Sequence, residues 1–122
     1  METLKVGFIG AGPRARSLSQ YLIFNEKNGE RVELTCVLDS NPEELNDWRY
    51  KVVGDGLFSN FDQLLKFDDL DAVLIITPPA THANFAEKCL QAGIHVWSEV
   101  PMGLSNDELF RIVDAEKGNK GN

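Results

Sequence analysis

The sequence predicts an α/β domain built on a doubly wound parallel sheet. Short apolar, β-branched segments alternate along the chain with segments in which apolar residues recur at helical spacing. The most hydrophobic segment, AVLIIT at positions 72–77, is typical of a central strand buried on both faces. The 122 residues are enough for one domain with a hydrophobic core, which we expect to extend over residues 1–122.

Five segments predict the strands, and turn or capping residues separate them. Strands are expected at 4–9, 32–38, 57–58, 72–77 and 94–97, with the sixth strand of the six-stranded form of this fold missing. Helices are expected at 13–24, from 41–42 onward, from 59–60 onward, at 81–91 and from 105 to about 117. Asn41 and Pro42 form an N-cap and a first helical residue, Gly93 ends a helix, and Ser105 with Glu108 makes a capping box.

The first loop has the composition of a dinucleotide-binding turn. Residues 10–15 (Gly-Ala-Gly-Pro-Arg-Ala) join the first strand to the first helix and fit the pattern G-x-G-x-x-G/A. Gly10 permits the tight turn, Gly12 leaves the backbone open to a pyrophosphate, and the small Ala15 lets the helix pack closely on the strand. Pro13 suits the first helical turn, where free N–H groups and the macrodipole favour an anion.

A carboxylate follows the second strand. Asp39 lies 24 residues beyond Ala15, near the spacing at which an acidic side chain binds the adenosine ribose. Its charge would repel a 2′-phosphate, and Ser40 and Asn41 bring no arginine that would bind one, so the sequence favours NAD over NADP. The alternative is that Asp39 only ends a strand before a turn.

The composition argues against several classes of partner. The net charge is −7 and the chain has no basic cluster, so nucleic acid and anionic membranes are poor candidates. No apolar segment approaches membrane-spanning length, and the N-terminus lacks the pattern of a signal peptide. Cys36 and Cys89 lack metal-ligand spacing, so we expect buried thiols in a reducing cytoplasm and no metal site.

Two further motifs follow the fourth and fifth predicted strands, at the sheet edge where such folds bind ligands. They are T-P-P-A-T-H at 77–82 and E-V-P at 99–101. Together with the glycine motif, they make residues 4–117 resemble the N-terminal Rossmann domain of the Gfo/Idh/MocA oxidoreductases, whose pattern is a glycine-rich turn, then T-P-x-x-x-H, then E-K-P. The resemblance implies the NAD-binding domain of a dehydrogenase that acts on a sugar, polyol or related small molecule.

The resemblance also implies a set of cofactor-binding residues. The set comprises Gly10, Ala11, Gly12, Pro13, Arg14, Asp39, Ser40, Thr77, Pro78, Pro79, His82, Glu99 and Pro101. The glycine loop would surround the pyrophosphate, residues 77, 78 and 82 would line the nicotinamide half, and residues 99 and 101 would lie near the nicotinamide ribose. For His82, a capping or packing role at the start of a helix is the alternative. His95, Trp48 and Trp97 match no motif and are expected to be structural.

The sequence departs from the family pattern in two ways. Val100 replaces the E-K-P lysine and carries no titrating group, so it cannot act as an acid or base and no catalytic residue is assigned. The α+β domain that holds most substrate contacts in family members does not follow, so we expect a truncated cofactor-binding domain that turns over no substrate alone. The unpaired edge of the strand at 94–97 then favours self-association, or is covered by the C-terminal tail of the chain.

Three functions compete at this stage. The first is the NAD-binding half of a dehydrogenase, whose small-molecule substrate binds only in the full-length protein. The second is a nucleotide-binding module or sensor without catalysis, which Val100 favours. The third is an S-adenosylmethionine methyltransferase, which shares a glycine-rich turn and an acidic residue after the second strand but does not explain the motifs at 77–82 and 99–101.

Overall fold

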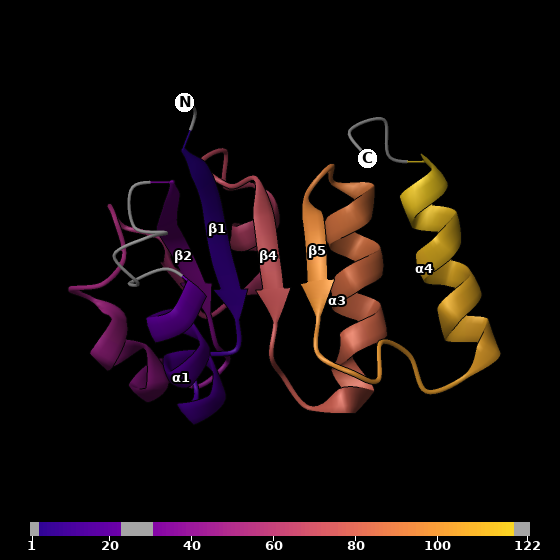
Figure 1. Ribbon diagram of the computed structural model, residues 1–122, viewed down its shortest axis with the longest axis horizontal. Helices are drawn as coiled ribbons and strands as arrows, with labels where there is room; N and C mark the ends of the chain where they lie inside the picture. Colours follow the sequence, from indigo (N-terminus) through magenta and orange to yellow (C-terminus); the bar gives the residue numbers. More distant parts are fainter. Residues whose placement is uncertain (1–2, 23–30, 119–122) are drawn as a thin grey trace.

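A five-stranded parallel sheet forms the centre of the molecule (Figure 1). The computed structural model describes residues 3–22 and 31–118. The strands are β1 (Leu4–Ile9), β2 (Val32–Leu38), β3 (Leu57–Phe58), β4 (Ala72–Ile75) and β5 (His95–Ser98). Their order is β3-β2-β1-β4-β5, and every pair is parallel. This confirms the predicted doubly wound sheet, and the described residues contain no sixth strand.

Helices connect the strands. They are α1 (Pro13–Leu22), η1 (Pro42–Trp48), α2 (Phe61–Leu65), α3 (Pro79–Gln91) and α4 (Asn106–Gly118). The second is a 3₁₀ helix that begins, as expected, after the Asn41 side chain caps the N–H of Glu43. Asn60 caps α2, and the Ser105 hydroxyl accepts a hydrogen bond from the N–H of Glu108. The predicted end of the first helix, at residues 23–24, lies outside the described residues.

Three predicted boundaries are shifted. Strand β4 ends at Ile75, opposite the last residue of β1, because the ladder has no partner strand beyond Ile9. Helix α3 begins at Pro79 rather than residue 81, since proline is well tolerated in the first turn of a helix. Strand β5 covers 95–98 rather than 94–97, in register with the whole of β4.

Two hydrophobic clusters lie on opposite faces of the sheet. Successive residues of β1 point to opposite faces of the sheet, so Phe8 belongs to one cluster and Ile9 to the other. Residues of α1 and η1 complete the cluster around Phe8, and residues of α2, α3 and α4 complete the cluster around Ile9. The result is a three-layer arrangement in which helices cover both faces of the sheet.

The arrangement brings several loops to one edge. The arrowheads of the parallel strands point the same way in Figure 1, so the loops after β1, β4 and β5 emerge along the carboxyl edge of the sheet. The chain reverses its direction of winding between β1 and β4, which is where open α/β sheets form a crevice. Among residues 3–22 and 31–118, no helix is both long and apolar enough to cross a membrane.

Candidate cofactor-binding site

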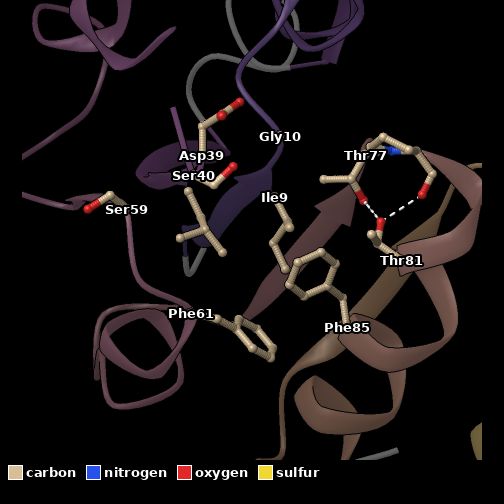
Figure 2. A pocket seen from close by; sticks show the side chains of 11 residues that line it. Ile9, Gly10, Asp39, Ser40, Ser59, Phe61, Thr77, Thr81 and Phe85 are labelled. Carbon is tan, nitrogen blue, oxygen red and sulfur yellow. Dashed lines mark hydrogen bonds between the residues drawn. The ribbon is translucent and has the colours of Figure 1, made fainter. Parts of the chain in front are cut away.

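A cleft of about 380 Å³ opens at the carboxyl edge of the sheet (Figure 2). Its lining comes from the ends of β1 and β2, from the loops that follow β1, β2, β3 and β4, and from helices α2 and α3. The lining residues are Ile9, Gly10, Leu38, Asp39, Ser40, Ser59, Phe61, Thr77, Pro78, Thr81 and Phe85. Five predicted site residues therefore meet in one cleft, namely Gly10, Asp39, Ser40, Thr77 and Pro78.

Gly10 makes the tight turn after β1. Its φ of +107° is a conformation that residues with a side chain rarely adopt. A Cβ atom here would lie 2.6 Å from the carbonyl oxygen of Ile76, which belongs to the chain leaving β4. The N–H of Gly10 donates to the carbonyl of Leu38 at 2.7 Å, so the turn is fixed against the end of β2. The role that the sequence predicts for Gly10 follows directly from this geometry.

Gly12 presents a different situation. A Cβ atom at this position would have no other atom within 4 Å, and Gly12 does not have a positive φ. The fold itself therefore does not require glycine here. The residue precedes α1, whose first N–H groups have no acceptors within the helix. Open space beside free N–H groups at a helix N-terminus fits a bound phosphate.

Asp39 is half-buried, and both of its carboxylate oxygens accept backbone hydrogen bonds. Oδ2 accepts from the N–H of Ala11 at 2.9 Å, and Oδ1 accepts from the N–H of Asn41 at 2.9 Å. Each carboxylate oxygen has two lone pairs, so the group keeps acceptor capacity toward the cleft. Asp39 thus fixes the glycine loop and also presents a negative charge to a ligand.

Apolar side chains form the wall opposite the glycine loop. Phe61 and Phe85 meet edge to face with ring centroids 4.8 Å apart. Figure 2 shows both side chains on the far side of Ile9 from Gly10. Thr77 and Thr81 share a hydrogen bond between their hydroxyl groups above them. A mostly apolar pocket with a few polar groups is typical of a small-molecule or cofactor site.

The sequence alone did not assign six of the lining residues to the site: Ile9, Leu38, Ser59, Phe61, Thr81 and Phe85. Phe85 has the spacing of a helix core residue, and only the fold shows that it borders a cleft. A usable signal for Ser59 and Phe61 was their position directly after the third strand, at the ligand-binding edge.

His82 lies beneath the loops rather than in the cleft. It is 1% exposed, and its ring nitrogens face two backbone carbonyls. Nδ1 lies 2.8 Å from the oxygen of Pro101, and Nε2 lies 2.6 Å from the oxygen of Thr77. The ring therefore joins the loop after β4 to the loop after β5. This placement agrees with the packing alternative for His82, and its contact with a cofactor stays a prediction.

The remaining predicted residues do not line the cleft. They are Ala11, Gly12, Pro13, Arg14, Pro79, His82, Glu99 and Pro101. Arg14 and Glu99 form an ion pair at 3.2 Å, which brings the end of β5 against the start of α1. Val100 is 85% exposed at the same edge. In the described residues, no three His, Cys, Asp or Glu side chains are arranged to hold a metal ion.

The sheet order, the glycine turn and the carboxylate after β2 together define an NAD-binding Rossmann domain. Residues 4–121 match the family model GFO_IDH_MocA, described as "Oxidoreductase family, NAD-binding Rossmann fold". The chain therefore belongs to this oxidoreductase family, as its motifs predicted.

Similar proteins are considerably longer than this chain. A glycosyl hydrolase family 109 protein of Shewanella pealeana is 35% identical over 130 residues, covering 98% of this chain and 28% of the relative. The WlbA dehydrogenase of Bordetella pertussis, solved with NADH and UDP-GlcNAcA, is 29% identical with a TM-score of 0.83, over 95% of this chain and 34% of that protein. The apo scyllo-inositol dehydrogenase of Lactobacillus casei is 25% identical with a TM-score of 0.85, over 97% of this chain and 34% of that protein.

Proposed function

We propose that this domain binds NAD for an enzyme that transfers hydride to or from a sugar, polyol or related small molecule. The observation that carries the proposal is the cleft in which the Asp39 carboxylate lies beside the glycine turn. Similar structures support the substrate class, since they include a dehydrogenase solved with NADH and a nucleotide sugar, and an inositol dehydrogenase.

The described residues fit the two halves of NAD. Asp39 would hold the adenosine ribose, and Phe61 and Phe85 would contact the adenine. The open backbone at Gly12 and the first turn of α1 would bind the pyrophosphate. The nicotinamide half would extend toward the residues after β4 and β5, which are Thr77, Pro78, Pro79, Glu99 and Pro101. When bound, the nicotinamide supplies the hydride acceptor or donor.

Asp39 makes the proposal testable through cofactor preference. Its charge next to the ribose should disfavour the 2′-phosphate of NADP, so we expect NAD to bind at least about tenfold more tightly in titration calorimetry. Asp39→Asn removes the charge and should narrow the difference. The matched control is Asp114→Asn, because Asp114 is an exposed carboxylate on α4, away from the cleft. Equal affinity of the wild-type chain for both cofactors would refute the role of Asp39.

A second candidate function is glycoside hydrolysis that uses NAD without net oxidation. The names of the Shewanella relatives favour it, since they are glycosyl hydrolase family 109 proteins. The two functions differ in their products. A dehydrogenase that is given NAD and a free sugar or polyol as substrate accumulates NADH. A hydrolase that is given a nitrophenyl glycoside releases nitrophenol and accumulates no NADH. Both assays should use the longest natural chain that carries this domain.

We further propose that substrate contacts come from a separate α+β domain. The chain spans 28% of the length of the Shewanella pealeana relative, and Val100 offers no proton-transfer group. Without positioned substrate, the 122-residue chain should turn over none of a panel of sugars and polyols with NAD. Robust NADH formation by this chain alone would contradict the proposal.

We also propose that the domain works in the cytoplasm. Cys36 and Cys89 are both free and buried, which fits a reducing compartment. The net charge of −7 supports small molecules rather than nucleic acid as ligands. Detection of the natural protein in fractionated cells tests the location, and enrichment in a secreted fraction would refute it.

A further inference from the structure

The peptide groups of the glycine loop are held by side chains from two different elements. Ala11 lies between Gly10 and Gly12 and is fully buried. Its N–H donates to Asp39 Oδ2 at 2.9 Å, and its carbonyl accepts from the indole Nε1 of Trp48 at 3.0 Å. Both backbone polar groups of this residue are therefore paired with side chains rather than with the sheet.

Trp48 is itself held rigidly. It is the last residue of η1, its side chain is fully buried, and its ring packs against Phe8 with a centroid distance of 5.6 Å. The ammonium of Lys51 lies 5.2 Å from the centroid of the Trp48 ring. An indole N–H has only one proton to donate and cannot accept, so its direction is fixed once the ring is packed.

The hydrogen bond to the Ala11 carbonyl also determines how the next N–H points. In a trans peptide, the carbonyl of one residue and the N–H of the following residue lie in one plane and point in opposite directions. Because the Ala11 carbonyl points at Trp48, the N–H of Gly12 points away from Trp48. Gly12 is the residue beside which a Cβ would meet only open space, at the start of α1.

A second side chain, that of Arg16, contacts the Ala11 carbonyl but binds it only weakly. Arg16 Nη1 lies 3.5 Å from the Ala11 oxygen, at the limit of a hydrogen bond. The same guanidinium nitrogen is shared with Asp47 at 3.3 Å and Glu44 at 3.5 Å. Loss of the indole N–H would leave a buried carbonyl with a poor partner and free this peptide group to rotate.

We propose that Trp48 is a positioning residue that directs the Gly12 N–H toward the pyrophosphate of the cofactor. The inference rests on the proposed NAD-binding function and goes beyond it by assigning a buried residue from a different element to the phosphate subsite. The inference predicts that Trp48 affects the affinity for ligands that carry a pyrophosphate. It should not affect the affinity for ligands that carry only the adenosine half.

The test compares ADP with adenosine. Trp48→Phe keeps a buried aromatic ring and removes the N–H, and the control Trp97→Phe changes a half-exposed indole on β5. In NMR-detected titrations of the full chain, Trp48→Phe should lower the affinity for ADP and for NAD about tenfold. This is the loss expected when one hydrogen bond is removed. Adenosine should bind within about twofold of wild type, and Trp97→Phe should change none of the three.

The outcomes separate the two levels of the argument. If Trp48→Phe weakens adenosine as much as ADP, its effect is one of packing and the inference is overturned. If ADP and adenosine both keep wild-type affinity, the inference is also overturned, while NAD binding stands. If the wild-type chain binds neither NAD nor ADP, both the proposed function and this inference are refuted.

A second measurement covers the case in which Trp48→Phe does not fold. In the wild-type chain, ADP and adenosine are each added until hydrogen exchange at the Val73 amide, in the core of β4, slows by the same factor. Exchange at the Trp48 indole should then slow more with ADP than with adenosine, and equal slowing of the indole by the two ligands would overturn the inference.

Discussion

Two glycines of the same loop should respond in opposite ways to the same substitution. Gly10→Ala should destabilise the fold, whereas Gly12→Ala should leave the fold intact and weaken cofactor binding. The contrast arises because Gly10 is required by the chain's own backbone, whereas the space beside Gly12 is open. The pair therefore separates a structural glycine from a ligand-binding one.

The magnitude at Gly10 follows from two costs. An alanine held at a φ of +107° costs about 1–3 kcal/mol, and its Cβ would lie 2.6 Å from the carbonyl oxygen of Ile76. That peptide segment cannot easily retreat, because the N–H of Ile76 bonds to the carbonyl of Ile9 at 2.8 Å. We expect the free energy of unfolding to fall by about 3 kcal/mol or more, measured by urea denaturation.

At Gly12 the terms nearly cancel. Alanine reduces the entropy of the unfolded chain, which stabilises by about 0.4–1 kcal/mol, and it is a poorer residue before a helix by a similar amount. The free energy of unfolding should therefore change by less than about 1 kcal/mol. The added methyl group occupies the approach to the α1 N-terminus, so NAD affinity should fall at least about tenfold, or 1.4 kcal/mol.

The control for this pair is Gly118→Ala. Gly118 also has open space around its Cβ position, but it lies at the end of α4, so stability and NAD affinity should both stay near wild type. Calorimetric titration with NAD and urea denaturation of each variant give the two readouts. Wild-type NAD affinity in Gly12→Ala would refute the assignment of the pyrophosphate to this backbone.

Three further predictions concern the core and the sheet edge. His82→Ala leaves two backbone carbonyls without their ring partner, so the free energy of unfolding in urea should fall by about 2–4 kcal/mol. Burial raises the pKa of Cys36 and of Cys89 to about 12 from 9.0, so each thiol contributes stability that is complete below about pH 9 and is lost as pH rises toward 12. Alkaline unfolding should show this loss at up to about 1.4 kcal/mol per pH unit per thiol, and alanine at both positions should flatten it. Light scattering should detect self-association that increases with concentration, and Trp97→Lys on the edge strand β5 should weaken it; a strict monomer would contradict this idea.

Local patterns were sufficient for much of the fold. The observed bounds of β1, β2 and β3 are the same as the predicted ones, because polar or turn residues lie on both sides of each of these apolar segments. The end of β4 could not be read in this way. Residues 76–77 continue its apolar run, and only the length of the neighbouring strand β1 decides where the ladder stops.

The candidate site shows the same division. Gly10 and Asp39 were predictable because a short motif and a fixed spacing carry their roles, and the structure places both in the cleft. Phe61, Phe85 and Trp48 were not, because each has the spacing of an ordinary core residue. Their importance depends on contacts across the fold, such as the indole bond to Ala11, which leave no periodic signal in one sequence.

The residues after β5 indicate whether this domain can supply a proton-transfer group in addition to binding NAD. Val100 is exposed and has no proton to exchange, while the neighbouring Glu99 is paired with Arg14. His82, which contacts the carbonyl of Pro101 in the same loop, has both ring nitrogens against backbone carbonyls. Glu99, Arg14 and His82 are thus engaged in holding loops together. We therefore expect the proton-transfer group of the proposed reaction to come from another part of the full-length protein, while this domain binds NAD.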